Sequence, residues 1–216
     1  VYPVPDGDTG TNMARTLDAV VAELDQAGPG IEPTCQAISH GSLMGARGNS
    51  GVILSQILRG LSGKLSAKAG STATEFAEAL SAASASAYQA VLKPIEGTIL
   101  TVTKKASIGA RRAADRGGRL VDVLREARSA GREALADTPN QLAVLKEAGV
   151  VDAGGAGFLL LPAIGAERTL DLVVLVSLAL AFGTLLVETG KLELRFALPA
   201  GLAIVTILSM LLLKPG

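Results

Sequence analysis

The apolar residues of this chain recur at helical spacing, and strand-like alternation is nearly absent. Met13, Leu17, Val20, Val21 and Leu24, for example, follow one another at the three- and four-residue intervals of a single helix face. Glycine and proline interrupt this pattern at short intervals, as they do where helices end and turns begin. The chain therefore predicts a series of helices joined by short connections.

Seven or so helices can be placed in this way before a hydrophobic C-terminal tail. We expect them from Thr9 or Thr11 to the break at 28–30, from Pro33 to the loop at 45–49, from Ser50 through Leu58, from about Thr74 to Leu92, from Thr98 to Arg116, from about Leu120 to Ala136, from Asn140 to Ala148, and onward from Asp152. Because Trp is absent and aromatic residues make up only 3%, the core must consist of aliphatic side chains. These features predict an all-α fold, an up-and-down bundle or helical barrel.

Charge and cysteine content exclude several kinds of protein. Twenty basic residues balance twenty acidic ones, so we expect no nucleic acid as a partner. Cys35 is the only cysteine, which rules out an internal disulfide and fits a reducing compartment. The sequence begins at Val1 without an initiator Met or a signal-peptide pattern, and we interpret it as a fragment whose upstream part is missing.

The tail differs in character from the rest, and we divide the chain into a domain over residues 1–167 and a tail over residues 168–216. Leu172–Val187 contains 16 residues without a charge, and Phe196–Leu213 contains 18. The second run would span roughly 27 Å as a helix, close to the thickness of a bilayer's hydrocarbon core. The tail therefore predicts a two-helix transmembrane hairpin, and the alternative is a pair of buried core helices.

The first motif that could carry chemistry lies in the glycine-rich segment 5–13. Asp6 and Asp8 stand two residues apart, just before a helix, and oxygen ligands on such a loop suit Mg²⁺. The helix start behind them, with Thr9 and Asn12, offers hydrogen-bond donors to an anion. The alternative is an ordinary Asp-Gly turn with a capping aspartate.

The second motif, Gly45–Gly51, again places glycines before a helix start. Glycine permits close approach of a ligand to the backbone, and the amides of Asn49, Ser50 and Gly51 could cradle phosphate oxygens. The segment is not a Walker A motif, because the Gly-Lys-Ser/Thr ending is missing. An ordinary glycine-rich helix connection is the alternative.

Two further segments repeat the arrangement. Residues 93–100 place Thr98 at a helix start, and residues 150–157 form another glycine-rich loop before a helix. In an up-and-down bundle alternate loops fall at the same end. Several glycine-rich loops at one end would form a rim of amide donors around carboxylates, which favours nucleotide binding over isolated turns.

Taken together, the four segments resemble the L-type domain of dihydroxyacetone kinases, and more closely the N-terminal domain of bacterial fatty acid kinases. The stretches 1–13, 40–60, 93–103 and 144–158 carry this resemblance, in the same order, and it covers about three-quarters of the chain. The resemblance implies an α-helical barrel of about eight helices. It also implies ATP or ADP bound at one end through Mg²⁺ that aspartates hold.

The resemblance also implies roles for individual residues. Asp6 and Asp8 match the magnesium ligands, Thr9, Gly10 and Asn12 the first phosphate loop, Asn49, Ser50 and Gly51 the second phosphate loop, Thr98 and Ile99 the helix start flanking the nucleotide, and Asp152, Ala153 and Gly154 the late loop near it.

From these observations we expect a kinase that transfers the γ-phosphoryl group to an acceptor presented by a partner. By resemblance the acceptor is a fatty acid on a carrier protein first, and dihydroxyacetone second. We further expect a homodimer whose domain lies in the cytoplasm, with residues 172–213 as a membrane anchor. The alternatives are a nucleotide-binding module without turnover, which the absent upstream segment motivates, and a membrane-tethered or fused membrane protein.

Overall fold

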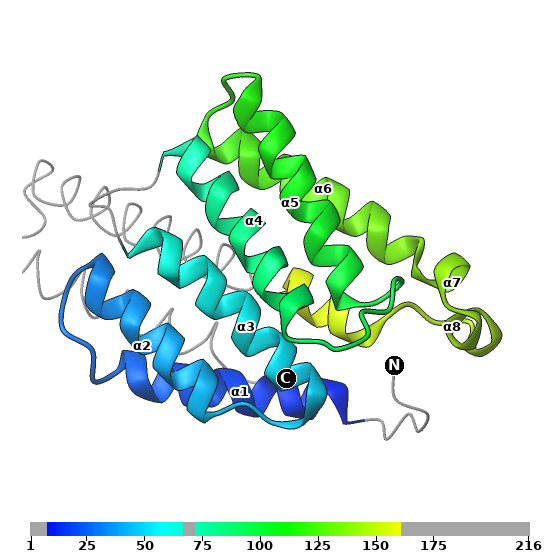
Figure 1. Cartoon of the computed structure of the whole chain (residues 1–216), viewed down its shortest axis with the longest axis horizontal. Helices are drawn as coiled ribbons and strands as arrows, with labels where there is room; N and C mark the ends of the chain where they lie inside the picture. Colours follow the sequence, from blue (N-terminus) through cyan, green and yellow to red (C-terminus); the bar gives the residue numbers. More distant parts are fainter. Residues whose placement is uncertain (1–7, 67–71, 161–216) are drawn as a thin grey trace, which may run out of the picture. The chain divides into compact units, whose positions relative to one another are not determined.

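The computed structural model describes residues 8–66 and 72–160, and these residues form nine helical segments and no strand (Figure 1). The segments are α1 (Thr9–Leu24), α2 (Ile31–Met44), α3 (Gly48–Leu65), α4 (Ala73–Gln89), α5 (Ile99–Asp115), α6 (Leu120–Ala136), α7 (Thr138–Gln141), α8 (Ala143–Ala148) and a further helix over residues 153–160. The all-α, up-and-down fold predicted from the sequence is confirmed.

Most helix boundaries lie close to the expectation, but α4 ends at Gln89 rather than at Leu92, and three further boundaries differ. The helix α2 begins at Ile31, so Pro33 lies within its first turn, and α3 begins at Gly48 rather than at Ser50. The expectation of a single helix over residues 140–148 is wrong. Two short helices, α7 and α8, replace it because Leu142 between them has an extended backbone.

Consecutive long helices pack side by side, in the order α1, α2, α3, α4, α5 and α6 (Figure 1). Small residues allow this close approach. A Cβ added to Gly60 of α3 would lie 2.7 Å from the Cα of Ala83 in α4, and one added to Gly109 of α5 would lie 2.6 Å from the carbonyl oxygen of Glu126 in α6. The core between α4, α5 and α6 is correspondingly rich in alanine, with Leu80 and Val123 as its larger members.

The helix over residues 153–160 packs against α1, α5 and α6. A Cβ added to Gly157 would lie 2.9 Å from the Cε of Met13 in α1, and one added to Gly155 would lie 2.7 Å from Val102 of α5. Its Leu159 lies against Gly131 of α6. These contacts place the starts of α1, α3, α5 and the 153–160 helix at one end of the bundle, toward the lower right of Figure 1.

The predicted transmembrane hairpin and the tail over residues 168–216 lie outside the described residues. Within the part of the chain that the structure describes, no helix is both long and apolar enough to span a bilayer.

Candidate functional site

The start of α1 carries an acidic residue that does not close the helix. Asp8 is the residue before α1, it is half-buried, and among the described residues its side chain makes no capping hydrogen bond to the helix. The backbone turn itself is regular, since the Asn12 amide donates to the Asp8 carbonyl oxygen over 2.8 Å. The first amides of a helix have no partner within the helix, so this start presents donors and a positive dipole end beside a carboxylate.

The start of α3 lies directly against the first turns of α1. Gly48 has φ +56°, and a Cβ added to it would lie 2.3 Å from the side-chain nitrogen of Asn12. Only glycine combines this left-handed backbone with such close packing. A Cβ on Gly51 would lie 2.5 Å from the Oγ1 of Thr16. Glycine is therefore required at both positions for the two helix starts to meet.

A buried threonine connects the same two starts. The Thr16 hydroxyl donates to the carbonyl oxygen of Asn12 over 2.7 Å and accepts from the amide of Arg47 over 3.3 Å. Arg47 is the residue before α3, and its side chain makes no capping hydrogen bond to that helix within the described structure. We refer to the starts of α1 and α3 as the open starts.

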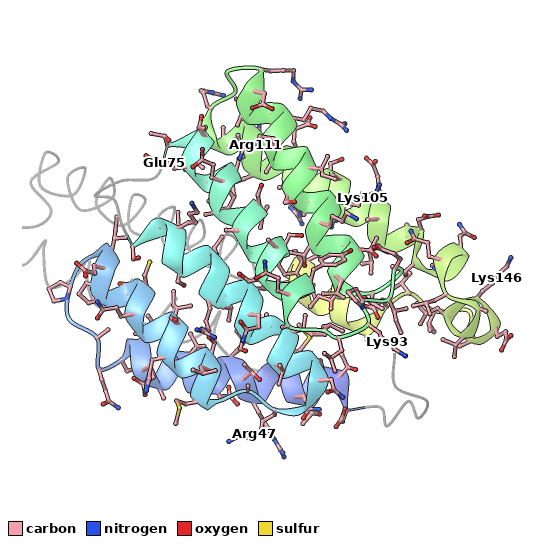
Figure 2. All side chains as sticks on the ribbon, in the orientation of Figure 1. Arg47, Glu75, Lys93, Lys105, Arg111 and Lys146 are labelled. Atoms are coloured by element: carbon pink, nitrogen blue, oxygen red, sulfur yellow. The ribbon has the colours of Figure 1, made fainter. Side chains whose placement is uncertain are left out.

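The expectation that the Gly51 amide is free is wrong. Because α3 begins at Gly48, Gly51 is already in the helical hydrogen-bond pattern, and its amide donates to the Arg47 carbonyl oxygen over 3.0 Å. The first-turn amides of α3 are those of Gly48, Asn49 and Ser50. Arg47 itself points away from the bundle at the α2–α3 junction (Figure 2), and its guanidinium donates to the carbonyl oxygens of Ala46 and Met44.

The starts of α5 and the 153–160 helix differ, because each is closed by its own side chain. Thr98 precedes α5, and its hydroxyl accepts from the Leu100 amide over 3.4 Å. Asp152 precedes the 153–160 helix, and its carboxylate accepts from the Gly155 amide over 2.7 Å. We refer to these two as the capped starts. They lie against each other, since a Cβ on Gly154 would lie 3.3 Å from the Cβ of Ile99.

Asp152 connects the two capped starts electrostatically. Burial raises the pKa of its carboxyl above the ordinary value, and hydrogen bonds from the backbone amides of Gly155 and Ile99 oppose that rise. The backbone amide of Asp152 in turn donates to the hydroxyl of Thr138 over 3.0 Å, and Thr138 is fully buried. One carboxylate thus lies between the first amides of two helices, which stabilise its negative charge but do not fully offset the effect of burial.

The structure brings most of the predicted site residues to one end of the bundle. Thr9, Gly10 and Asn12 lie in the first turn of α1, Asn49 and Ser50 in that of α3, Thr98 and Ile99 at the start of α5, and Asp152, Ala153 and Gly154 at the start of the last helix. Asp6 lies outside the described residues. Sequence reasoning missed Thr16 and Thr138, because nothing in the neighbouring sequence marks either hydroxyl as a contact to another helix start.

The described residues contain part of what a magnesium site needs. Within residues 8–66 and 72–160, no three His, Cys, Asp or Glu side chains are grouped closely enough to hold a metal ion. Mg²⁺, however, commonly takes only one or two protein carboxylates and completes its coordination with phosphate oxygens and water. Asp8, with its carboxylate unengaged by the helix behind it, has the chemistry of such a ligand.

The chain belongs to the DAK2 domain family, because the model of that family matches residues 3–164. It is 48% identical over 160 residues to an uncharacterized protein of Staphylococcus epidermidis and to protein YloV of Bacillus subtilis, and 46% identical to an uncharacterized protein of Staphylococcus aureus. Each match covers 74% of this chain and 29% of the relative. The chain therefore spans less than a third of the length of these relatives.

Membership of the family defines the class of the site. The DAK2 domain is the nucleotide-binding subunit of dihydroxyacetone-kinase-type systems, in which it works with a partner subunit. Domains of this family bind ADP or ATP, and membership of the family indicates a kinase-related role.

Proposed function

We propose that this chain is an ATP- and Mg²⁺-dependent phosphotransferase domain that binds the nucleotide phosphates at the open starts of α1 and α3. One observation carries the proposal. Two helix starts without side-chain caps meet beside the Asp8 carboxylate, and Gly48 and Thr16 hold them together. The start of α3 lies against the first turns of α1, so an anion bound there could accept from the first amides of both helices and interact favourably with both dipole ends.

In the proposed complex the phosphates lie between the two first turns. The amides around Thr9 and Gly10 approach from α1, and those of Asn49 and Ser50 approach from α3. Gly10 suits this task because it is exposed and a Cβ added to it would meet nothing within 4 Å. Its surface is therefore accessible to a ligand rather than covered by the protein.

Asp8 and Asp6 are the proposed magnesium ligands. The bound ion would offset the charge of the transferring phosphoryl group and align the β- and γ-phosphates. For Asp8 the support is its position, half-buried at a helix start with its carboxylate unengaged by that helix.

The capped starts have a different proposed task. Thr98, Ile99 and Gly154 flank the nucleotide, while Asp152 braces the helices that carry them. The support is that the Asp152 carboxylate is already occupied by the Gly155 amide, so it is better suited to holding the rim than to contacting phosphate.

The acceptor is proposed from resemblance alone. A fatty acid on a carrier protein comes first and dihydroxyacetone second, and in both cases a substrate-carrying protein or subunit presents it to the γ-phosphate. The domain would act in the cytoplasm as a homodimer. No residue is assigned as a general base, which the loose transition state of phosphoryl transfer tolerates.

Titration calorimetry of the full chain with ATP, with and without Mg²⁺, tests the binding part of the proposal. We expect magnesium-dependent binding with a Kd in the micromolar range, on the order of −8 kcal/mol. Absence of binding under both conditions would contradict the proposed function.

A second candidate is nucleotide binding without turnover. It is favoured by the open starts themselves, whose first amides can bind phosphates without a metal ion. An assay of ATP consumption in the presence of a protein that carries a fatty acid, or of dihydroxyacetone, separates the two candidates. Binding without consumption of ATP would support the second candidate and exclude the first for this chain.

A further inference from the structure

The connection between α4 and α5 leads into one of the helix starts at the proposed nucleotide site. Two different parts of the molecule hold this connection in place. This segment, residues 90–98, ends at Thr98, and Figure 2 shows its Lys93 on the same side of the molecule as Lys146 of α8. Gly97 has φ +81°, and a Cβ added to it would lie 2.9 Å from Gln141 and 3.2 Å from Leu142. One side of the segment therefore packs against the junction of α7 and α8.

The other side is held by a polar network centred on Glu96. The Tyr88 hydroxyl donates to the Glu96 carboxylate over 3.0 and 3.2 Å, and the Thr101 hydroxyl donates to it over 2.5 Å. The Gly97 amide donates to the Thr101 oxygen over 2.8 Å. Lys104 completes the group, with its ammonium 3.8 Å from Glu96 and 5.3 Å from the centre of the Tyr88 ring.

The direction of each hydrogen bond in this network is determined. Because the Thr101 oxygen accepts from the Gly97 amide, its own proton is directed to Glu96. The Glu96 carboxylate then receives two hydroxyl protons, and both hydrogen bonds favour its ionised form. The same contacts lower the pKa of Glu96, with the Thr101 hydrogen bond as the largest cause. Burial and the Glu96 contact raise the pKa of Tyr88 to about 12, which keeps its hydroxyl a donor.

We propose that Glu96 is a positioning residue for the nucleotide site, which holds the start of α5 in place through the Thr101 hydroxyl and the Gly97 amide. This inference rests on the proposed function. Gly97 directly precedes Thr98. The next amide along the chain, that of Ile99, donates a hydrogen bond to the Asp152 carboxylate. The backbone of residues 97–99 thus joins the hydrogen bonds of Tyr88, Glu96 and Thr101 to those that Asp152 makes at the start of the last helix.

The exposure of Glu96 separates this role from core packing. Its side chain is 53% exposed, so it contributes little buried area, yet it accepts hydrogen bonds from two different helices. Tyr88 belongs to the last turn of α4 and Thr101 to the first turn of α5. The carboxylate therefore ties the end of one helix to the beginning of the next, at the end of the bundle where the nucleotide is proposed to bind.

The test uses the full chain carrying Glu96→Gln, Thr101→Val or both. Glutamine has about the same size but cannot accept both hydroxyl protons as well as a carboxylate does. We expect the Kd for ATP with Mg²⁺ to rise by about five- to tenfold in each single variant, about one tenfold step on the affinity scale. Because both changes act on the same Gly97 amide, the double variant should lose no more than about the larger single loss. Amide hydrogen exchange of residues 97–100 without nucleotide should also be faster in each variant.

Glu126→Gln is the matched control. Glu126 is a similarly exposed glutamate, 46% exposed, whose carboxylate lies 3.7 Å from Arg116 on the α5–α6 hairpin. This variant should bind ATP as the unchanged chain does and leave hydrogen exchange at residues 97–100 unaltered.

The inference is overturned if Glu96→Gln and Thr101→Val bind ATP with unchanged Kd, or if their losses simply add. Faster exchange at residues 97–100 without any loss of affinity would also overturn it, since Glu96 would then be structural only. If the unchanged chain itself fails to bind ATP, the proposed function fails and this inference with it, and that outcome is distinguished by the unchanged chain alone.

Discussion

The open starts of α1 and α3 and the capped starts of α5 and the 153–160 helix lie at the same end of the bundle, yet they are built differently. Thr98 and Asp152 close their own helices, whereas the described part of the chain provides no such side-chain cap from Asp8 or Arg47. At the opposite end, α4 begins with a capping box between Thr72 and Glu75, and at the start of α6 the Asp122 carboxylate accepts from the Arg119 amide. The start of α2 also lacks a side-chain cap, because Gly30 precedes it, so the starts of α1 and α3 are distinguished by lying against each other.

Such an omission has a cost in folding free energy. A good N-cap residue typically stabilises a helix by about 1 kcal/mol, so two open starts forgo on the order of 2 kcal/mol. A bound phosphate would return that stabilisation, because anions bind the same amides. The comparison therefore predicts that loss of the Asp8 carboxylate mainly changes affinity, whereas loss of the Asp152 cap mainly changes stability.

The largest expected effect is on nucleotide affinity, from Asp8→Ala. The variant should lose about 100-fold in magnesium-dependent affinity for ATP, about 2.7 kcal/mol. Its folding free energy should change by less than about 0.5 kcal/mol, because the side chain makes no capping bond to lose. Titration calorimetry and urea denaturation measure the two quantities. Equal affinity in the variant would mean that Asp8 is an ordinary turn residue.

Gly48→Ala should damage the junction between the open starts. A side chain at φ +56° that also meets Asn12 should cost about 2 kcal/mol of folding stability, and ATP affinity should fall with it. Gly10→Ala is the matched variant, since its added methyl meets no protein atom. It should keep or slightly raise stability and weaken ATP binding only. Denaturation midpoints compare the folding stability of the two variants with that of the unchanged chain. A loss of folding stability in Gly10→Ala would contradict the proposed role of Gly10.

Asp152→Ala should instead destabilise the fold, by about 1.5 kcal/mol, because the Gly155 amide loses its cap. Asp152→Asn keeps an accepting oxygen and should retain most of that stability. The raised pKa of Asp152 gives the sign of the pH effect: its contribution to stability is full below the ordinary pKa and is lost as pH rises through the raised one. The asparagine variant should lack this dependence. Unchanged stability with abolished ATP binding in Asp152→Ala would make Asp152 a ligand contact rather than a brace.

The smallest effect concerns Tyr88 and high pH. Its pKa is raised from 10 to about 12, so the stability that its donated hydrogen bond contributes is full below pH 10 and is lost as pH rises toward about 12. Tyr88→Phe should remove this part of the alkaline loss of stability. Urea denaturation of both proteins across that pH range measures the difference, and parallel curves would contradict the network described for Glu96.

The helices were largely predictable, because their signals are local. The range of α6 was predicted to the residue, and Thr98 was correctly placed at the start of α5. The separation of α7 from α8 was not predicted, because Leu142 is neither a glycine nor a proline and its extended backbone reflects tertiary packing. Gly97 against Leu142 is one of the contacts involved.

The candidate site was predictable in outline only. Glycine-rich loops before helices indicated which segments meet, because alternate loops share one end of a bundle. The sequence did not distinguish open from capped starts, because this difference depends on side-chain geometry at Asp8 and Asp152. Thr16, Thr138 and Glu96 were also missed, since each acts through a partner far along the chain or across a turn.

The central claim is that ATP binds at the open starts, and amide hydrogen exchange of the full chain with and without ATP and Mg²⁺ tests it most directly. The account predicts the strongest added protection at the first turns of α1 and α3, over residues 9–11 and 48–50, and weaker protection around residues 98–100 and 153–155. Protection at the starts of α4 and α6, or none at residues 9–11 and 48–50, would contradict it.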